Sequence, residues 1–427
     1  MRRTERTLPP ATRRRTLLVI TQGYVPDPGS FGQHLADVLP EVVRRGWRVV
    51  LFTPARGHDD ASLRYPSREV IAGVEVRRLP ASSFGKRSME LRVLAGVSFM
   101  TQCALRGLFV RDLSVVLVAT APLASFAALC IAALRGAALK YWVLDINPDQ
   151  LIALGWLREG GPVARLWEWL NGRVLRRAAD VLVLDRFMGD RLSRKADRPI
   201  NLHVVTPWPL EDHLAPVDPA ANPFRAEHDL NDRFVILYSG NHGVTTPVST
   251  LLGAALELRD LENLLFLFIG GGYGKLEVER FIHEHGDGNV RSLPYQPLSR
   301  IRYSLSAGDV HAVTMSDDVV GIIHPSKIYC AMGVGRPLLA VGPRPSPLSE
   351  IVDRYGVGWC VANGDVDGAA RTIREIVATD RVELERMGRR AQRVAAEKFG
   401  KEDLLGRVAD VLVEDVAAPS YVPSRAG

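Results

Sequence analysis

Two successive series of short apolar runs, each followed by a turn and a helical pattern, dominate the sequence. The first series includes Thr16–Ile20, Arg48–Thr53 and Val115–Ala119, and the second includes Phe234–Ser239 and Leu338–Val341. Short runs rich in Val, Ile and Leu are typical of buried parallel strands, and the helical stretches between them provide the crossovers. We therefore expect an α/β protein with two Rossmann-like doubly wound domains facing a cleft.

Changes in composition along the chain predict the domain boundaries. Residues 1–15 form a basic arm without the apolar stretch of a signal peptide. The expected parts after it are a first Rossmann-like domain (16–206), a proline- and charge-rich linker (207–232), a second Rossmann-like domain (233–400), a terminal helix (401–416) and a flexible tail (417–427).

Val115–Leu134 contains no charged residue and is long enough to span a bilayer. The β-branched start at Val115–Ala119 suits a central strand, and Pro122 suits the start of a helix. The following strand, Lys140–Leu144, also needs this unit within the sheet. We therefore favour a buried strand and helix over a membrane span.

The four cysteines are scattered and have no metal-binding spacing, which fits a reducing cytosol and argues against a disulfide framework or a zinc site. The net charge of +6 is uneven: residues 1–210 contain 31 Lys and Arg against 18 Asp and Glu, whereas the remainder contains 23 against 30. This asymmetry predicts that the first half meets an anionic surface. No nucleic-acid-binding motif is visible, so we expect a membrane surface rather than nucleic acid.

Val319–Gly342 combines a flexible turn at Gly321, a helix start at Pro325 and an apolar strand after Gly335. Proline suits the first turn of a helix because its missing N–H would be unpaired there. Ser326 and Lys327 would then lie at the positive end of the helix, where an anion is favoured. A phosphate site is one interpretation; an ordinary helix–strand unit with a surface lysine is the other.

Two glycine-containing turns follow strands of the second series. Gly270–Lys275 (GGGYGK) is not a P-loop, because Ile269 and Leu276 occupy positions that need Gly and Ser or Thr. It also fails the dinucleotide pattern, but its glycines permit close approach to a phosphate or nucleoside. In Ser239–Gly243 (SGNHG), His242 is either a phosphate donor or a structural turn residue.

Together, these segments resemble the GT-B glycosyltransferases, especially the retaining family 4 enzymes that build bacterial surface polysaccharides such as colanic acid or O-antigen. The resemblance runs from about Thr16 to Val416. The segments that carry it are Gly29–Gly32, Asp145–Pro148, Ser239–Gly243, Gly270–Gly272, His324–Tyr329 and Gly335–Pro337. It implies a metal-independent transferase without a cofactor, using a nucleotide-diphospho-sugar that we expect to be UDP-linked, and a lipid-linked or saccharide acceptor.

The resemblance also implies the site residues. Those expected to bind the donor are Gly32, Asn241, His242, Gly271, Gly272, Asp318, His324, Pro325, Ser326 and Lys327. Lys327 would stabilise charge on the diphosphate. Asp145 would bind or orient the acceptor, although it would equally suit a cap for a helix beginning near Pro148.

The sequence departs from the family 4 pattern at the donor site. These enzymes usually carry Glu-x7-Glu, which contacts the donor sugar and the ribose, but the equivalent positions fall near Val320 and Cys330. Asp317 or Asp318 is the candidate replacement for the sugar contact. The usual Arg and Lys on the diphosphate are absent from residues 241–246, which leaves Lys327 as the best cation. A nucleotide-sugar epimerase of the same fold and an inactive nucleotide-sugar-binding subunit are the alternatives.

We expect the protein to be cytoplasmic and peripheral on the inner face of the membrane. The basic pairs Arg44-Arg45, Arg77-Arg78 and Lys86-Arg87 would meet anionic lipid. In the helical stretch Met89–Arg106, Leu91, Leu94, Val97 and Met100 share one face. The alternative is that this apolar stripe faces the core.

Overall fold

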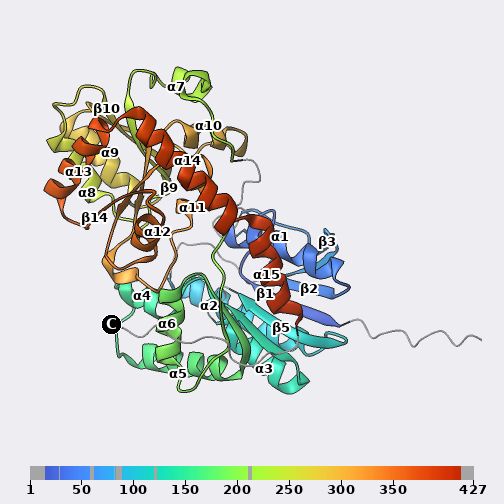
Figure 1. The fold of residues 1–427 in the computed structure, drawn as a ribbon. Coiled ribbons are helices and arrows are strands. Elements are labelled where there is room, and N and C mark those ends of the chain that lie inside the picture. Colours follow the sequence, from blue (N-terminus) through green and yellow to red (C-terminus); the bar gives the residue numbers. More distant parts are fainter. Residues whose placement is uncertain are drawn as a thin grey trace, which may run out of the picture.

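The computed structural model describes residues 15–27, 29–57, 62–80, 82, 89–119, 123–209 and 214–414. Two α/β domains, one above the other in Figure 1, each surround a sheet that is mainly parallel. The expected fold class, two doubly wound units, is confirmed.

The first sheet has the strand order β3-β4-β2-β1-β5-β6-β7-β8. Its neighbours pair in parallel except β3 and β4, which are antiparallel. Its strands are β1 (Thr16–Thr21), β2 (Arg48–Pro54), β3 (Arg68–Ile71), β4 (Val74–Leu79), β5 (Leu113–Ala119), β6 (Ala138–Trp142), β7 (Ala178–Val183) and β8 (Leu202–Val204). The central strands β1 and β5 are buried over most of their length, which is why they read as continuous apolar runs.

The second sheet is parallel throughout, with the order β11-β10-β9-β12-β13-β14. Its strands are β9 (Phe234–Asn241), β10 (Leu264–Gly271), β11 (Val290–Leu293), β12 (Val310–Thr314), β13 (Leu338–Val341) and β14 (Gly358–Val361). The order reverses direction at β9 and β12. In an open parallel sheet, ligands bind beyond the carboxyl ends of the strands at such a switch point.

Helices cover both faces of each sheet. Those of the first domain are α1 (Ser30–Arg44), α2 (Met89–Gly107), α3 (Ala124–Arg135), α4 (Asp149–Ala153), α5 (Pro162–Arg177) and α6 (Arg186–Lys195). Those that follow are α7 (Pro223–Glu227), α8 (Ser249–Glu257), α9 (Lys275–His285), α10 (Ile301–Ser306), α11 (Lys327–Gly333), α12 (Pro347–Tyr355), α13 (Val366–Ala378), α14 (Arg381–Lys398) and α15 (Lys401–Val413). Short 3-10 helices occupy Pro219–Ala221, Leu298–Arg300 and Asp317–Val319.

Val115–Leu134 forms strand β5 and helix α3, as expected, although Pro122 lies outside the described residues. Ala127, Ala128 and Ile131 of α3 are buried against the sheet. No helix within the described ranges is both long and apolar enough to cross a bilayer.

The last two helices return the chain from the second domain to the first. Figure 1 shows α15 lying beside α1, and Arg45, which directly follows α1, pairs with Asp410 of α15 at 2.5 Å. The buried Lys140 of β6 contacts Asp180 at 2.9 Å and donates to the main-chain oxygen of Glu414 at 3.0 Å. The terminal helix therefore packs on the first domain. The expected tail at 417–427 lies outside the described residues, as do residues 1–14 of the basic arm.

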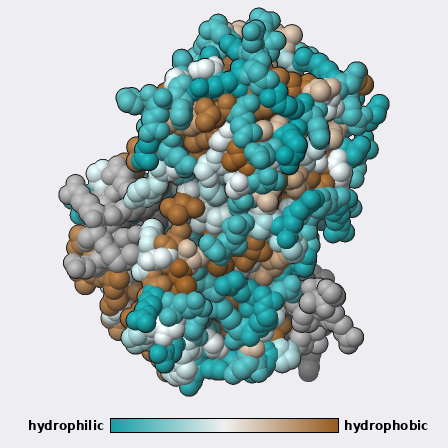
Figure 2. All heavy atoms as spheres, turned by 90° about the vertical axis from the view of Figure 1, so that its left-hand side faces the viewer, coloured by the Kyte–Doolittle hydropathy of each residue, from teal (hydrophilic) through white to brown (hydrophobic). Residues whose placement is uncertain are grey.

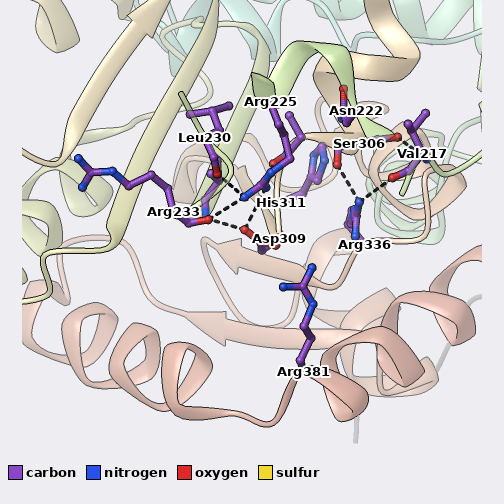
Figure 3. Close-up of polar contacts among 12 residues, drawn as sticks. Val217, Asn222, Arg225, Leu230, Arg233, Ser306, Asp309, His311, Arg336 and Arg381 are labelled. Carbon is purple, nitrogen blue, oxygen red and sulfur yellow. Dashed lines mark hydrogen bonds and ion pairs between the residues drawn. The ribbon is translucent and has the colours of Figure 1, made fainter. Parts of the chain in front are cut away.

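The second half of the stretch expected to be a linker is folded onto the second domain. It contains α7, whose Phe224 is fully buried with Val235 and Leu237 of β9. Arg225 is 3% exposed and lies near the amino-terminal ends of β9 and β12 (Figure 3). Its guanidinium donates to the main-chain oxygens of Ala307 (2.5 Å), Leu230 (2.5 Å) and Arg233 (2.7 Å) and to Asp309 (3.3 Å).

Replacing Arg225 with Ala should destabilise the second domain by about 3–5 kcal/mol, because it leaves several buried carbonyl groups without their donor and removes the positive charge that pairs with Asp309. Urea unfolding of the full chain measures the effect. Arg371→Ala, on the exposed face of α13, is the matched control and should change stability by less than about 0.5 kcal/mol. Equal effects of the two substitutions would contradict the anchoring role of Arg225.

Candidate functional site

Two strand-to-helix turns interlock at the carboxyl ends of β9 and β10. The main-chain N–H of His242 donates to Gly271 O at 2.8 Å, and that of Gly274 donates to His242 O at 2.8 Å. A Cβ atom on Gly270 would lie 1.9 Å from Gly240 O, and one on Gly272 would lie 2.5 Å from Asn241 Oδ1. Gly270 and Gly272 also have positive φ angles of 139° and 118°. These glycines therefore allow the two turns to pack directly on each other.

Lys327 reaches across from α11 to this pair of turns. Its Nζ donates to Tyr238 Oη at 2.6 Å and to Asn241 O at 3.2 Å, and lies 4.1 Å from the centre of the Tyr238 ring. Tyr238 Oη in turn donates to Asn241 O at 2.8 Å and contacts Thr246 Oγ1 at 3.1 Å. The amine is thus held in one place at the carboxyl ends of the strands.

The half-buried Lys327 has no carboxylate partner among these contacts. The surrounding protein removes water from the ammonium group and lowers the pKa of Lys327 from 10.5 to about 7. An anion placed against the amine would favour the charged form and supply the missing counter-charge. The site therefore has the electrostatic character of an anion-binding position.

The ring of His242 is fully buried beneath the turns and lies against Tyr238 and Phe268, at 4.7 and 6.2 Å between ring centres. Neither ring nitrogen has a hydrogen-bond partner among the described residues. Burial, with Lys327 and Lys275 nearby, lowers the pKa of His242 to about 4. The ring is therefore neutral near pH 7, and this geometry favours the structural interpretation of His242.

The helix expected to start at Pro325 starts at Lys327 instead. Pro325 is buried just before it, and Ser326 is the exposed residue preceding the helix, without a side-chain capping bond. The main-chain N–H of Ser326 donates to His324 O at 3.0 Å, so this part of the chain forms a tight turn first. Gly321, with φ of 69°, and the end of the helix at Gly333 follow the expected pattern.

His324 lies at a contact between the two domains. Its Nδ1 is 2.7 Å from Asp185 Oδ2 in the first domain, and its Nε2 is 2.8 Å from Tyr329 Oη in α11. Its side chain is 1% exposed. Both ring nitrogens therefore face protein groups. In the observed arrangement the ring is not available to bind a nucleotide-sugar.

Asp145 lies beyond the carboxyl end of β6, beside a second domain contact in which Ile146 N donates to Ile322 O at 3.0 Å. The expected capping role is not observed, because α4 begins at Asp149 without a side-chain cap. Asp145 is exposed on one side, yet the surrounding protein raises its pKa to about 6. The pKa rises because the protein removes water from one side of the carboxylate, and water on the exposed side makes this rise smaller.

The remaining expected residues lie apart from the two turns. Gly32 packs in α1, where a Cβ atom would lie 2.9 Å from Tyr24 Cα. Asp318 is exposed in a short 3-10 helix, while its neighbour Asp317 accepts from Asn363 Nδ2 at 2.9 Å. The structure therefore brings Asn241, His242, Gly271, Gly272 and Lys327 together in one cluster. It places Gly32 and Asp145 in the other domain and His324 at the domain contact.

Sequence reasoning missed Tyr238 and Thr246, which position Lys327 and the first turn. Thr246 Oγ1 accepts from Gly243 N at 2.9 Å. The only available signal was the location of Tyr238 near the end of a strand that leads into a glycine turn. Among the described residues, no group of three or more His, Cys, Asp or Glu could hold a metal ion.

We expect UDP-glucose to bind more weakly as the pH rises from 6.5 to 8.5. Both phosphates of this ligand stay ionised over that range, whereas Lys327, with a pKa of about 7, changes from mostly charged to mostly neutral. The loss should approach tenfold per pH unit above the pKa, if one proton is linked to binding. Calorimetric titration measures it.

Lys327→Met keeps an apolar stem but has no titrating group, so its weaker binding should be nearly independent of pH. His242 stays neutral throughout this range because its pKa is about 4. Asp145, with a pKa of about 6, ionises mainly below this pH range. The same pH dependence in the Met variant would assign it to a group other than Lys327.

Comparison with known proteins identifies the family of the chain. Residues 29–208 match the family model described as "Glycosyl transferase 4-like domain", and residues 221–394 match "Glycosyl transferases group 1". The chain is 29% identical over 242 residues to the probable glycosyltransferase WbjE of Pseudomonas aeruginosa, covering 56% of this chain and 60% of that protein. It is 27% identical over 252 residues to the putative colanic acid biosynthesis glycosyl transferase WcaI of Escherichia coli, covering 57% and 61%. The matches thus span about 60% of the length of each relative.

Two solved structures have the same fold. Sucrose-phosphate synthase from Thermosynechococcus elongatus superposes with a TM-score of 0.72 at 16% identity, covering 93% of this chain and 98% of that one. HepE from Anabaena, solved in complex with UDP, superposes with a TM-score of 0.69 at 14% identity, covering 93% and 99%. With two transferase models matched in succession on two facing sheets, the chain belongs to the GT-B glycosyltransferases.

Proposed function

We propose that the protein transfers a sugar from a UDP-linked donor to a lipid-linked saccharide during the synthesis of a surface polysaccharide. The observation that carries the donor side is Lys327, desolvated and held on Tyr238 where the strands of the second domain end. WcaI, a similar protein, is described as a putative colanic acid transferase, and HepE was solved with UDP and with UDP-glucose. Both descriptions support this substrate class.

The proposed reaction retains the configuration at the sugar carbon. The bond between that carbon and the β-phosphate oxygen breaks, and the acceptor hydroxyl oxygen forms the new bond from the same face. The hydroxyl proton passes to the leaving phosphate. Lys327 stabilises the negative charge that develops on the diphosphate. Asp145, on the opposite side of the cleft, orients the acceptor hydroxyl.

The test is incubation with a panel of UDP-sugars, with and without lipid extracts as acceptors. A transferase incorporates the sugar into lipid or hydrolyses the donor slowly, an epimerase isomerises the donor, and a binding subunit leaves it unchanged. Lys327→Ala should weaken donor use by about 2–4 kcal/mol, as for loss of one preorganised charge-stabilising donor. Unchanged donor use in this variant would overturn the assignment of Lys327.

Membrane docking is the second part of the proposal, but the basic pairs expected to mediate it are engaged elsewhere. Arg45 pairs with Asp410 at 2.5 Å and Arg77 with Glu75 at 3.1 Å. Arg78 is buried and pairs with Glu69. Lys86 and Arg87 lie outside the described residues. Arg45, Arg77 and Arg78 therefore make intramolecular contacts.

Exposed apolar side chains instead gather on the neighbouring helices α2, α3 and α5. On α2, Leu91, Leu94 and Val97 are 39%, 57% and 42% exposed, so this part of the stripe does not face the core. On α5, Leu166 and Trp169 are also exposed, and Arg173 lies 4.6 Å from the Trp169 ring centre. Figure 2 shows hydrophobic residues reaching the surface of this lower domain. Tryptophan beside arginine suits the interface of an anionic membrane.

We expect the protein to bind vesicles containing anionic phospholipid at low salt, to be released as the salt concentration rises, and to ignore neutral vesicles. The double variant Leu166→Ala, Trp169→Ala should weaken binding about tenfold or more, because it removes two large apolar side chains from the interface. Sedimentation with vesicles measures both effects. Val382→Ala, at an exposed apolar position on α14, is the control. Retention that ignores salt would contradict electrostatic docking.

A further inference from the structure

A cavity of about 260 Å³ lies in the first domain, between the end of β6 and helices α5 and α6. In Figure 1 these helices lie together on the left side of the lower domain. The residues that line the cavity are Tyr141, Val143, Ile146, Asn147, Glu168, Asn171, Gly172, Leu175, Leu192 and Lys195. None of them has a role in the donor site.

The inner wall of the cavity is hydrocarbon, and its polar groups mostly bond to each other. Val143, Ile146, Leu175 and Leu192 are buried apolar residues. Asn171 Nδ2 donates to Asn147 O at 2.5 Å, and Lys195 Nζ contacts Glu168 at 3.2 Å. Lys195 also pairs with the buried Asp149 at 2.6 Å. An apolar wall with a satisfied polar edge suits an amphiphile whose hydrocarbon part enters and whose polar part stays outside.

The position of the cavity links it to the acceptor side of the cleft. Ile146 and Asn147, which line it, directly follow Asp145 in the chain. Tyr141, also in the wall, has its pKa raised to about 12 by burial and by the nearby charge of Asp145. On α5, Asn171 and Leu175 line the cavity, whereas Leu166 and Trp169 of the same helix are exposed. The cavity therefore lies between Asp145 and the helix that we propose to meet the membrane.

We propose that this cavity binds the hydrocarbon segment next to the saccharide of a lipid-linked acceptor, and so sets the acceptor hydroxyl against Asp145. The reaction it serves rests on the proposed function, but the binding of hydrocarbon does not. A cavity of 150 Å³ holds benzene, so the volume here accommodates about ten carbons. The rest of a longer hydrocarbon chain would leave the cavity along α5 towards the membrane.

Gly172 offers a direct way to fill the cavity. It lies in the middle of α5 and lines the cavity, and a Cβ atom on it would meet no atom within 4 Å. Gly172→Leu therefore places a side chain in the empty space without a main-chain clash, and it improves helix propensity. Gly406→Leu is the matched control, because Gly406 is a glycine of α15 that also has no neighbour within 4 Å of its Cβ position.

The experiment measures binding of alkyl β-glucosides of increasing chain length, below the concentrations at which they form micelles, by calorimetry. For the wild type and Gly406→Leu, each added methylene should tighten binding about threefold to fourfold until the chain reaches about ten carbons, after which the affinity levels off. Gly172→Leu should lose at least tenfold in affinity for the longer chains and level off several carbons earlier. Methyl β-glucoside should bind weakly and equally to all three proteins.

Affinity that does not depend on chain length, or that is the same in Gly172→Leu and wild type, would overturn the proposal. Binding of UDP-glucose is measured on the same proteins and should be unchanged by Gly172→Leu. If wild type binds alkyl glucosides as expected but not UDP-glucose, the transferase proposal fails while the hydrocarbon site stands. If it binds UDP-glucose but not alkyl glucosides, only the hydrocarbon site fails.

Discussion

The close approach of two main-chain turns sets the geometry of the whole donor side. Gly240 and Gly270 lie so near each other that a side chain on Gly270 would overlap the carbonyl oxygen of Gly240. Because of this contact, β9 and β10 end side by side, and Tyr238 and Asn241 present their oxygens to one amine. Lys327 reaches them from α11, which follows the next strand of the sheet. Substituting either turn would therefore move the cation as well as the main chain.

One short segment connects this donor side to the acceptor side. Ile322 accepts a main-chain hydrogen bond from Ile146, next to Asp145, and His324 contacts Asp185 of the same domain. Arg186 and Glu350 form a further ion pair between the domains at 2.6 Å. Lys327 follows a few residues later in the same segment. Residues 321–327 therefore tie the position of the cation to that of Asp145, which a transferase needs if donor and acceptor are to meet in register.

Patterns along the chain predicted the sheets well because parallel strands are buried on both faces. Leu338–Val341 has the predicted bounds. β3 was not predicted, because REVI has only two apolar residues, which follow two charged ones at an antiparallel sheet edge. β14 was not predicted, because GWCV starts with glycine and contains few β-branched residues. At the site, glycine spacing and the cation at Lys327 were visible in the sequence. The Tyr238 contact and the location of His324 between the domains depend on residues 89 and 139 positions apart, which no local pattern encodes.

The central claim is that Lys327 is the cation of a diphosphate site built on the two interlocked turns. A crystal structure of the protein with UDP-glucose tests it most directly. The account predicts a β-phosphate oxygen within hydrogen-bonding distance of Lys327 Nζ, about 2.7–3.2 Å, with the amine still contacting Tyr238. A diphosphate bound elsewhere, with no phosphate oxygen within hydrogen-bonding distance of Lys327 Nζ, would contradict it.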